Sequence, residues 1–314
     1  MRTFFNSLFP PQASNLAPKV DAIYFVLLGL SGIVALVVCL AIVFFCIKYR
    51  RGSGADRTPP EARPRRFEIG WTVIPFLLFL GLFLWAADVF FAMSRPPANA
   101  TEIYIVGKQW MWKVQHPDGR REINELHLPV GHPVKLIMTS QDVIHDFFIP
   151  AFRNKQDVVP GRYTTEWFTP TRPGTYHLFC AQYCGTDHAR MVGTIHVLRP
   201  AEYAKWLRQQ PAPDSLVAAG ERAFRARGCS GCHAPEAAIR APLLDGIYGK
   251  QVPLSDSTLV TANEQYLRDS ILLPNKQITA GYESIMPTFQ GQISEEELNA
   301  IIAYLKSQRE EQPQ

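Results

Sequence analysis

Two short stretches of this chain gather residues that can bind redox-active metal groups. The first holds Cys180, Cys184, His188 and Met191 within twelve positions, and a second histidine, His145, lies 35 positions before Cys180. Thiolate, thioether and imidazole are soft or borderline ligands, and they select copper over hard cations. Two thiolates four positions apart can bridge two copper ions, each bound by one imidazole. Such a pair shares one electron and needs little ligand movement on reduction, so the stretch predicts an electron-transfer site.

The second stretch reads Cys229-Ser-Gly-Cys232-His233, which is the spacing of covalent haem c attachment. In that chemistry the two cysteines add to the porphyrin vinyl groups and the adjacent histidine binds the iron. A methionine as the sixth ligand raises the reduction potential. Met286 is the only methionine after His233, so it is the predicted sixth ligand of one covalently bound haem c.

Other kinds of site use the same residue types. Cys180 and Cys184 could form a disulfide in an oxidising compartment, or they could bind zinc together with two histidines. A zinc site would leave Met191 without a role and would carry no electrons. Cys229 and Cys232 could be redox-active or half of a zinc ribbon, but no second Cys-x-x-Cys completes a ribbon.

Two apolar runs near the N-terminus predict a membrane hairpin. No charged residue occurs from 22 to 47, a length of roughly 39 Å as a helix, against a hydrocarbon core of about 30 Å. The second run, 70–93, contains only one charge, Asp88. The loop between them, 48–67, holds seven Lys and Arg residues against two acidic ones, so the positive-inside rule predicts a cytoplasmic loop. Everything after residue 95 then faces outward, where haem c is normally attached.

The rest of the chain changes from strand-like to helical patterns. Residues 101–199 hold short β-branched and aromatic segments separated by turns, which predict a β-sandwich or barrel. Ser294 and Glu297 form a capping-box pattern ahead of an apolar helical stripe. The predicted division is an outer N-terminal segment (1–21), the hairpin (22–95), a copper domain (96–199), a linker (200–214) and a helical haem domain (215–314).

Much of residues 20–199 resembles subunit II of cytochrome c oxidase, including Asp142-Val-Ile-His145-Asp-Phe-Phe-Ile-Pro150, Pro160-Gly161-Arg162 and Arg172-Pro173-Gly174. The resemblance implies a cupredoxin-like sandwich carrying dinuclear copper A. Its implied ligands are His145, Cys180, Cys184, His188, Met191 and the backbone carbonyl of Gln182. Glutamate is common in the family at the position of Gln182, and its side chain often binds magnesium, so magnesium binding is doubtful here.

The resemblance also implies roles for residues outside the copper ligands. Trp110 matches the position where electrons enter copper A, and Asp142 matches an acidic residue of the cytochrome c docking surface. Glu68, three residues before Trp71-Thr72, matches a glutamate at the entrance of a proton path. Residues 215–314 resemble a class I, all-α cytochrome c, in which the carbonyl of Pro242 would hold the haem histidine His233. Other histidines, such as His127 and His196, are expected to be surface or strand residues.

Composition limits the range of functions. The net charge of +4 comes from the loop at 48–67, because 96–199 holds eleven basic and nine acidic residues and 215–314 holds nine and twelve, so nucleic-acid binding is not expected. No histidine precedes His116, so the oxygen-reducing site must lie on a partner chain. We expect the small opposite charges of the two outer domains to matter less than the tether in keeping them together.

The resemblance therefore implies the electron-inlet subunit of a bacterial plasma-membrane oxidase. Its partners would be subunit I, other oxidase subunits and an external cytochrome c or similar donor. Two alternatives stay open: the same module in a nitric oxide reductase, and a stand-alone membrane-tethered electron carrier.

Overall fold

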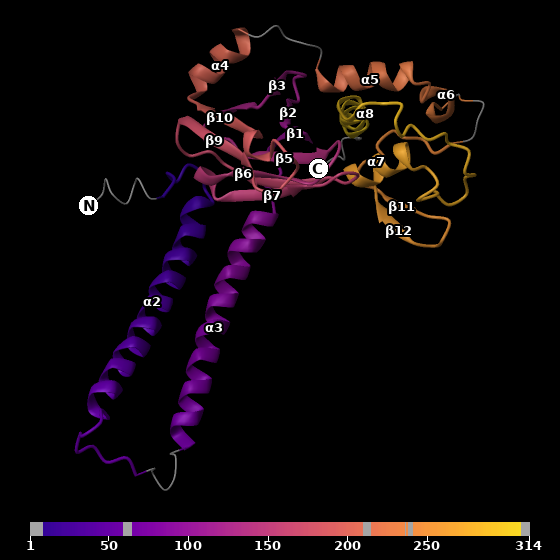
Figure 1. Cartoon of the computed structure of the whole chain (residues 1–314). Helices are drawn as coiled ribbons and strands as arrows, with labels where there is room; N and C mark the ends of the chain where they lie inside the picture. The colour runs from indigo at the N-terminus through magenta and orange to yellow at the C-terminus, as the bar shows by residue number, and fades with distance from the viewer. Residues whose placement is uncertain (1–8, 59–64, 210–214, 236, 238–240, 309–314) are drawn as a thin grey trace. The chain divides into compact units, whose positions relative to one another are not determined.

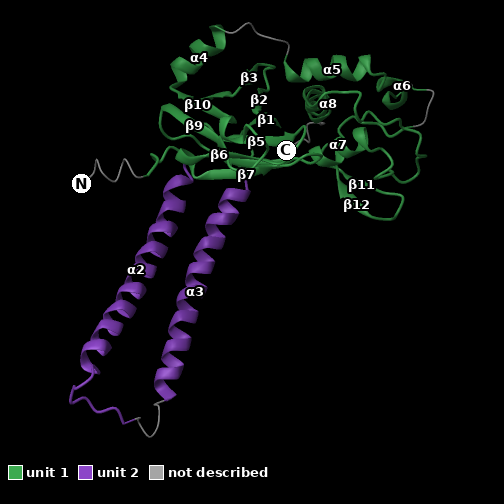
Figure 2. Ribbon diagram, viewed as in Figure 1, with its two compact units in different colours: residues 1–14, 96–314 green, residues 15–95 purple. Residues whose placement is uncertain are grey.

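The chain divides into two compact units, of which one is a pair of long helices (Figures 1 and 2). The structure is a computed structural model and describes residues 9–58, 65–209, 215–235, 237 and 241–308. One unit comprises residues 15–95, and the other comprises residues 1–14 and 96–314.

The helical unit consists of α2 (Ala17–Lys48) and α3 (Arg65–Ser94). Both helices are long and apolar enough to cross a membrane, with mean hydropathy of 3.0 and 2.2 over their most apolar windows. Each extends beyond the apolar run that predicts it, because charged residues can continue a helix outside a hydrocarbon layer. Large apolar side chains are exposed on both helices, as expected of surfaces that face lipid or other helices rather than water.

The other unit, which comprises residues 1–14 and 96–314, contains a sandwich of two five-stranded sheets. One sheet has the order β3-β2-β1-β5-β8 and the other β4-β10-β9-β6-β7. The first is built from β1 (Thr101–Lys108), β2 (Met111–Gln115), β3 (Arg121–Ile123), β5 (Val134–Ser140) and β8 (Thr164–Phe168). The second is built from β4 (Glu125–Pro129), β6 (His145–Ile149), β7 (Asn154–Val158), β9 (Gly174–Cys180) and β10 (Val192–Leu198).

Strand alternation fills the space between these sheets with apolar side chains. In β9 every second residue is buried, ending at Cys180, and β10 alternates in the same way. Trp112, Phe147 and Phe168 are fully buried, and the Trp112 ring meets Phe147 edge-on with centroids 5.0 Å apart. The pairs β1–β5 and β4–β10 are parallel and the remaining pairs antiparallel, so the two sheets are mixed.

The predicted linker, 200–214, is helical over most of its length. Helix α4 (Pro200–Gln209) begins directly after β10, and Trp206 stacks on His127 of β4 with ring centroids 4.6 Å apart. A linker interpretation based on proline and glutamine content misses this helix, because the aromatic contact that holds it comes from a strand about 80 positions away. Residues 210–214 lie outside the described part of the chain.

The C-terminal region is mainly helical. It comprises α5 (Leu216–Ala226), α6 (Ser230–His233), α7 (Glu264–Leu272) and α8 (Glu295–Ser307). Two short strands, β11 (Gln251–Pro253) and β12 (Leu259–Thr261), add a small antiparallel sheet to a region predicted to be entirely helical. Both strands have only three residues, too few for a period-two pattern to reveal them.

Helices α5 and α8 cross closely at Gly220. A Cβ atom at this position would lie 1.9 Å from the backbone oxygen of Ala300, so only glycine fits. The apolar stripe of α8, with Leu298, Ile301 and Ile302 almost fully buried, packs into the core of this region. The Ser294 hydroxyl accepts a hydrogen bond from the Glu297 amide, whereas the Glu297 carboxylate pairs with Arg227 of the α5 end.

The C-terminal helices also contact the first sheet of the sandwich directly. Leu216 and Ala300 pack with Tyr104 and Ile137 in one buried cluster. The polar contacts around it join Lys113 to Glu296, Tyr163 to Asn299, Lys306 to Glu102 and Lys135 to Glu264. The expectation that a tether would matter most is therefore incomplete, because packing and several charged or polar pairs also connect the two regions.

Candidate metal and haem sites

Strand pairing brings the distant histidine to the cysteine-rich stretch. His145 is the first residue of β6 and Cys180 the last of β9. These strands are antiparallel neighbours, with Phe147 opposite Cys180. The short helix η2 (His188–Arg190) then turns the chain back toward β10, and Met191 follows it.

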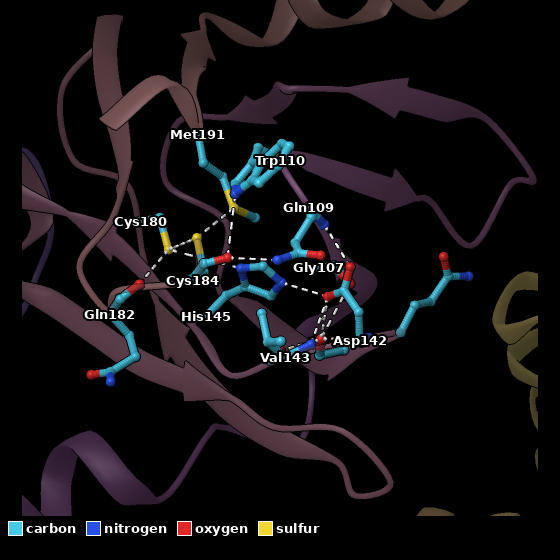
Figure 3. A network of polar contacts seen from close by, with 12 residues as sticks. Gly107, Gln109, Trp110, Asp142, Val143, His145, Cys180, Gln182, Cys184 and Met191 are labelled. Carbon is cyan, nitrogen blue, oxygen red and sulfur yellow. Dashed lines mark hydrogen bonds and ion pairs between the residues drawn. The ribbon is translucent and has the colours of Figure 1, made fainter. Parts of the chain in front are cut away.

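The six predicted ligand groups converge at this end of the sandwich, and Figure 3 shows all of them except His188. The Sγ atoms of Cys180 and Cys184 lie 3.8 Å apart. The Cys180 Sγ is 4.0 Å from Nδ1 of His145 and 3.2 Å from the carbonyl oxygen of Gln182. The remaining distances, both from the Cys184 Sγ, are 3.5 Å to Nδ1 of His188 and 3.8 Å to Sδ of Met191.

Both cysteines of this site are free thiols. Their sulfur separation far exceeds the bond length of about 2.05 Å in a disulfide. Burial raises the pKa of the Cys180 thiol, but its contacts with His145, backbone groups and Cys184 outweigh burial and lower the pKa to about 7. Burial and the neighbouring Cys180 raise the pKa of Cys184 to about 12. The two thiols therefore oppose each other's ionisation, because two adjacent thiolates repel.

The donor set fits soft or borderline metal ions. Most of the donor residues are buried, since His145 and Met191 are 0% exposed and Cys184 is 3% exposed, whereas His188 is partly exposed. The two thiols stand side by side with one imidazole next to each, which is the arrangement needed for two bridged ions. Met191 contacts the same cluster, and a zinc site with two cysteines and two histidines would not use it.

A second layer of contacts holds these groups in place. The Asp142 carboxylate accepts a hydrogen bond from Nε2 of His145 at 2.9 Å and another from the backbone N–H of Gln109 at 2.8 Å. The Gln109 side chain donates to the carbonyl oxygen of Cys184 at 2.8 Å. A side chain at Gly185 would clash here, because its Cβ would lie 2.9 Å from Nε2 of Gln109. Sequence reasoning does not identify Gln109, since a glutamine carries no signal until its partners are known.

Trp110 lies against the cysteine loop. Its Nε1 donates to the carbonyl oxygen of Cys184 at 3.3 Å, and the residue is partly exposed. Gln182 directs its carbonyl toward Cys180, whereas its side chain points away from the sulfur atoms (Figure 3).

The predicted haem residues line one cavity of about 310 Å³. Cys229, Cys232 and His233 form one wall at α6, and Met286 lies in a segment without helix or strand. Nδ1 of His233 is 2.7 Å from the carbonyl oxygen of Pro242. This contact leaves Nε2 as the nitrogen able to bind iron and fixes the plane of the ring. The residues fit a covalently attached haem with one histidine and one methionine ligand.

Glu68 belongs to neither of these sites. It lies exposed in the first turn of α3, in the helical unit, and its backbone oxygen accepts a hydrogen bond from Thr72.

Comparison with known proteins finds matches to two regions of the chain. Residues 120–198 match the family model described as cytochrome c oxidase subunit II, periplasmic domain, and residues 217–309 match the cytochrome c model. A cytochrome c oxidase subunit 2 from Thermostichus vulcanus is 31% identical over 262 residues, covering 66% of this chain and 80% of that protein. This chain belongs to the cytochrome c oxidase subunit 2 family.

Other members of the family span more of the chain. The cytochrome c oxidase subunit 2 of Alkalihalophilus pseudofirmus is 30% identical over 292 residues, which cover 86% of this chain and 82% of that subunit.

Among solved structures, the periplasmic domain of cytochrome oxidase subunit II from Bradyrhizobium japonicum is 32% identical, covering 37% of this chain and 96% of that domain, with a TM-score of 0.35. The predicted family and the order of a sandwich followed by a cytochrome c region are confirmed.

Proposed function

We propose that this subunit carries electrons from a covalent haem c to dinuclear copper A and on to subunit I of a membrane oxidase. The observation that carries the proposal is the convergence of six donor groups, two of which are free thiols, in a chain where a Cys-x-x-Cys-His sequence also lines a cavity. The proposed copper domain spans 96–199 and the proposed cytochrome domain spans 215–314.

The proposed copper ligands are His145, Cys180, Cys184, His188, Met191 and the carbonyl of Gln182. When bound, the copper pair would supply a one-electron centre that shares its charge between two ions. The protein's part is to keep the ligands still. Asp142 orients His145, and Gln109 holds the loop of Cys184, so little rearrangement is needed when an electron arrives.

The proposed haem attachment uses Cys229 and Cys232, with His233 and Met286 as the iron ligands. Pro242 positions His233 through its carbonyl oxygen. We propose that electrons reach the copper site near Trp110, because its indole joins the protein surface to the backbone of a ligand residue.

A magnesium ion is left out of the proposal. Gln182 offers an exposed neutral amide, and magnesium prefers carboxylate and water oxygens.

The proposed location is a bacterial plasma membrane, with both metal domains on the outer side. Two membrane-length helices, the basic residues that follow α2 and the family membership support it. Oxygen reduction would take place on subunit I, and the proposed partners include other oxidase subunits and a soluble cytochrome c or similar donor.

Rapid mixing of the purified complex with a reduced soluble cytochrome c tests the electron path. We expect haem c to be reduced first, the near-infrared copper band to change next, and oxygen uptake to follow. In Cys184→Ser, haem c should still be reduced while oxygen uptake stops. The matched control is Cys39→Ser, which changes an exposed cysteine of α2. This variant should behave as wild type.

Three outcomes would contradict this function. They are migration of the chain alone after mild detergent extraction, consumption of nitric oxide in place of oxygen by the purified complex, and unchanged oxygen uptake in Cys184→Ser.

Glu68 is proposed to serve the entrance of a proton path on the cytoplasmic side. Glu68→Gln should slow steady-state oxygen uptake, because a neutral amide cannot pass on a proton, and should leave the rate of haem c reduction unchanged. Both rates can be measured on the same preparation. Equal turnover in the variant and the wild type would contradict the role.

A further inference from the structure

A second group of potential metal ligands lies on the outer face of the sandwich, apart from the copper and haem residues. Strands β4 and β10 run parallel, and the register places His127 opposite His196 and Glu125 opposite Thr194. Leu126 and Ile195 point into the core and are 0% exposed, so their neighbours in sequence point outward. The donor atoms of Glu125, His127 and His196 all lie within 4.8 Å of one another.

We propose that these three residues bind one divalent transition-metal ion, zinc or copper(II). Two imidazoles and one carboxylate match the preferences of these borderline cations, and water can complete the coordination. The site lies at the edge strand of its sheet, with Glu125 exposed and both histidines partly exposed, so an ion can enter from solvent. An ion here would be separate from the two proposed redox groups.

The surroundings of His127 are those of a metal-binding histidine. Its Nδ1 is hydrogen-bonded to the Glu122 carboxylate, and Glu122 Oε1 also accepts the His127 backbone amide at 3.1 Å. The same Oε1 atom of Glu122 also contacts Nε2 of His116 at 2.6 Å. A carboxylate on one ring nitrogen fixes the orientation and leaves the other nitrogen for an ion. Trp206 of α4 covers one face of the same ring.

His196 is the residue that must move. Its ring stacks on that of His127 with centroids 4.4 Å apart and planes 17° from parallel. The lone pairs of parallel rings do not converge on one point, so binding requires the His196 ring to rotate. Nothing opposes this rotation through hydrogen bonding, since neither ring nitrogen of His196 has a hydrogen bond within the described part of the chain.

The ion would join the edge strand β4 to β10 beneath α4. Because α4 precedes the cytochrome region in the chain, metal binding would stabilise the part of the sandwich from which that region extends. The negative charge of Glu125 would offset part of the charge of the ion.

Metal retention by the intact complex tests the proposal. The complex, with copper and haem in place, is incubated with zinc chloride or with copper(II) chloride, passed through a desalting column and analysed for metals. We expect one additional zinc or one additional copper per chain in the wild type. His196→Ala should weaken zinc binding at least about tenfold, as expected for loss of one of three ligands.

His177→Ala is the matched control. His177 lies on the adjacent strand β9 and is exposed on the same sheet, where it stacks on Phe179, but it is outside the three-residue group. Zinc retention should be unchanged in it. The near-infrared copper band and the haem c spectrum report folding in each variant, and Glu125→Gln, at an exposed position, replaces His196→Ala if that variant does not fold.

Three results would overturn the site. The first is no retained zinc or additional copper in the wild type. The second is equal retention in the wild type and the ligand variants, and the third is an equal loss in His177→Ala, which indicates adventitious binding to surface histidines only.

Discussion

The copper and haem sites differ in how completely the protein builds them by itself. The proposed copper ligands lie at strand ends and in a short loop, and His145, Cys184 and Met191 are at most 3% exposed. Their neighbours Asp142 and Gln109 already hold them by hydrogen bonds. The proposed haem-binding residues instead line a cavity of about 310 Å³, between short helices and a segment around Met286 without regular structure.

This difference follows from what surrounds each site. A β-sandwich has its own apolar core, so its edge can hold ligands in place before metal arrives. The cytochrome region has fewer buried residues, and the porphyrin would supply apolar contacts that its walls would otherwise lack. We therefore expect the sandwich to fold without copper and then to bind it. We expect the cytochrome region, in contrast, to need haem for its own stable fold.

The largest expected effect is on copper itself. Cys184→Ser should abolish the near-infrared absorption of the copper pair, because a hydroxyl does not bridge two copper ions as a thiolate does. The haem c spectrum should be unchanged, since the haem residues belong to a different part of the chain. Absorption spectra of the purified subunit measure both. A persisting near-infrared band would contradict Cys184 as a bridging ligand, and an altered haem c spectrum would show that the two sites are not independent.

The next effect concerns haem and folding. The double variant Cys229→Ser, Cys232→Ser should lack covalent haem and lose amide-exchange protection in α8, while β9 and β10 keep theirs. A haem in this cavity would bury apolar lining residues such as Leu244, Leu267 and Phe289, and burial of apolar surface is a large part of the stability of a small domain.

Acid–acetone extraction followed by hydrogen-exchange mass spectrometry checks both parts of this prediction. Equal protection of α8 with and without haem would remove the proposed asymmetry between the two sites.

A smaller effect is expected when the iron ligand Met286 is changed while the covalent attachment of the haem is kept. Met286→Ala should lower the haem reduction potential by on the order of 100 mV, because a thioether ligand favours the reduced iron. Covalent attachment should persist, since both cysteines remain. A spectroscopic redox titration measures the potential, and an unchanged midpoint would exclude Met286 as a ligand.

The smallest effect concerns the contact between the two regions. Lys306, Tyr248 and Lys135 surround Glu264, and although burial alone would raise its pKa, these partners lower it to about 2. The lowered pKa stabilises the folded protein above the ordinary pKa of 4.5, and this contribution is lost as the pH falls toward 2. The loss of unfolding free energy would be on the order of 3 kcal/mol.

Chemical denaturation monitored through the haem c spectrum, and repeated between pH 6 and about pH 2, measures how the unfolding free energy depends on pH. Glu264→Gln should flatten it, because an amide does not titrate. An equally steep loss in the variant would assign the effect to other carboxylates.

Much of both sites could be predicted because their residues are close in sequence. Cys180 to Met191 span twelve positions and Cys229 to His233 span five, so chain connectivity alone keeps these groups near one another. Long apolar runs likewise predict α2 and α3, since the period and length of a helix are local properties.

Contacts between distant segments could not be predicted in the same way. Gln109 and Gly220 look ordinary in the sequence, and their roles arise only where the Cys184 loop and the Ala300 carbonyl come close. The composition of 200–214 predicts a linker rather than helix α4, because the contact of Trp206 with His127 joins segments about 80 positions apart.

The sequence by itself therefore determined the chemical types of ligand, their local spacing and the membrane-length helices. Only the tertiary structure decided that His145 meets Cys180, that the C-terminal helices pack on the first sheet, and that Glu125, His127 and His196 share one face. The physical reason is that local spacing follows from the chain, whereas strand pairing and helix docking depend on the combined burial of many distant side chains.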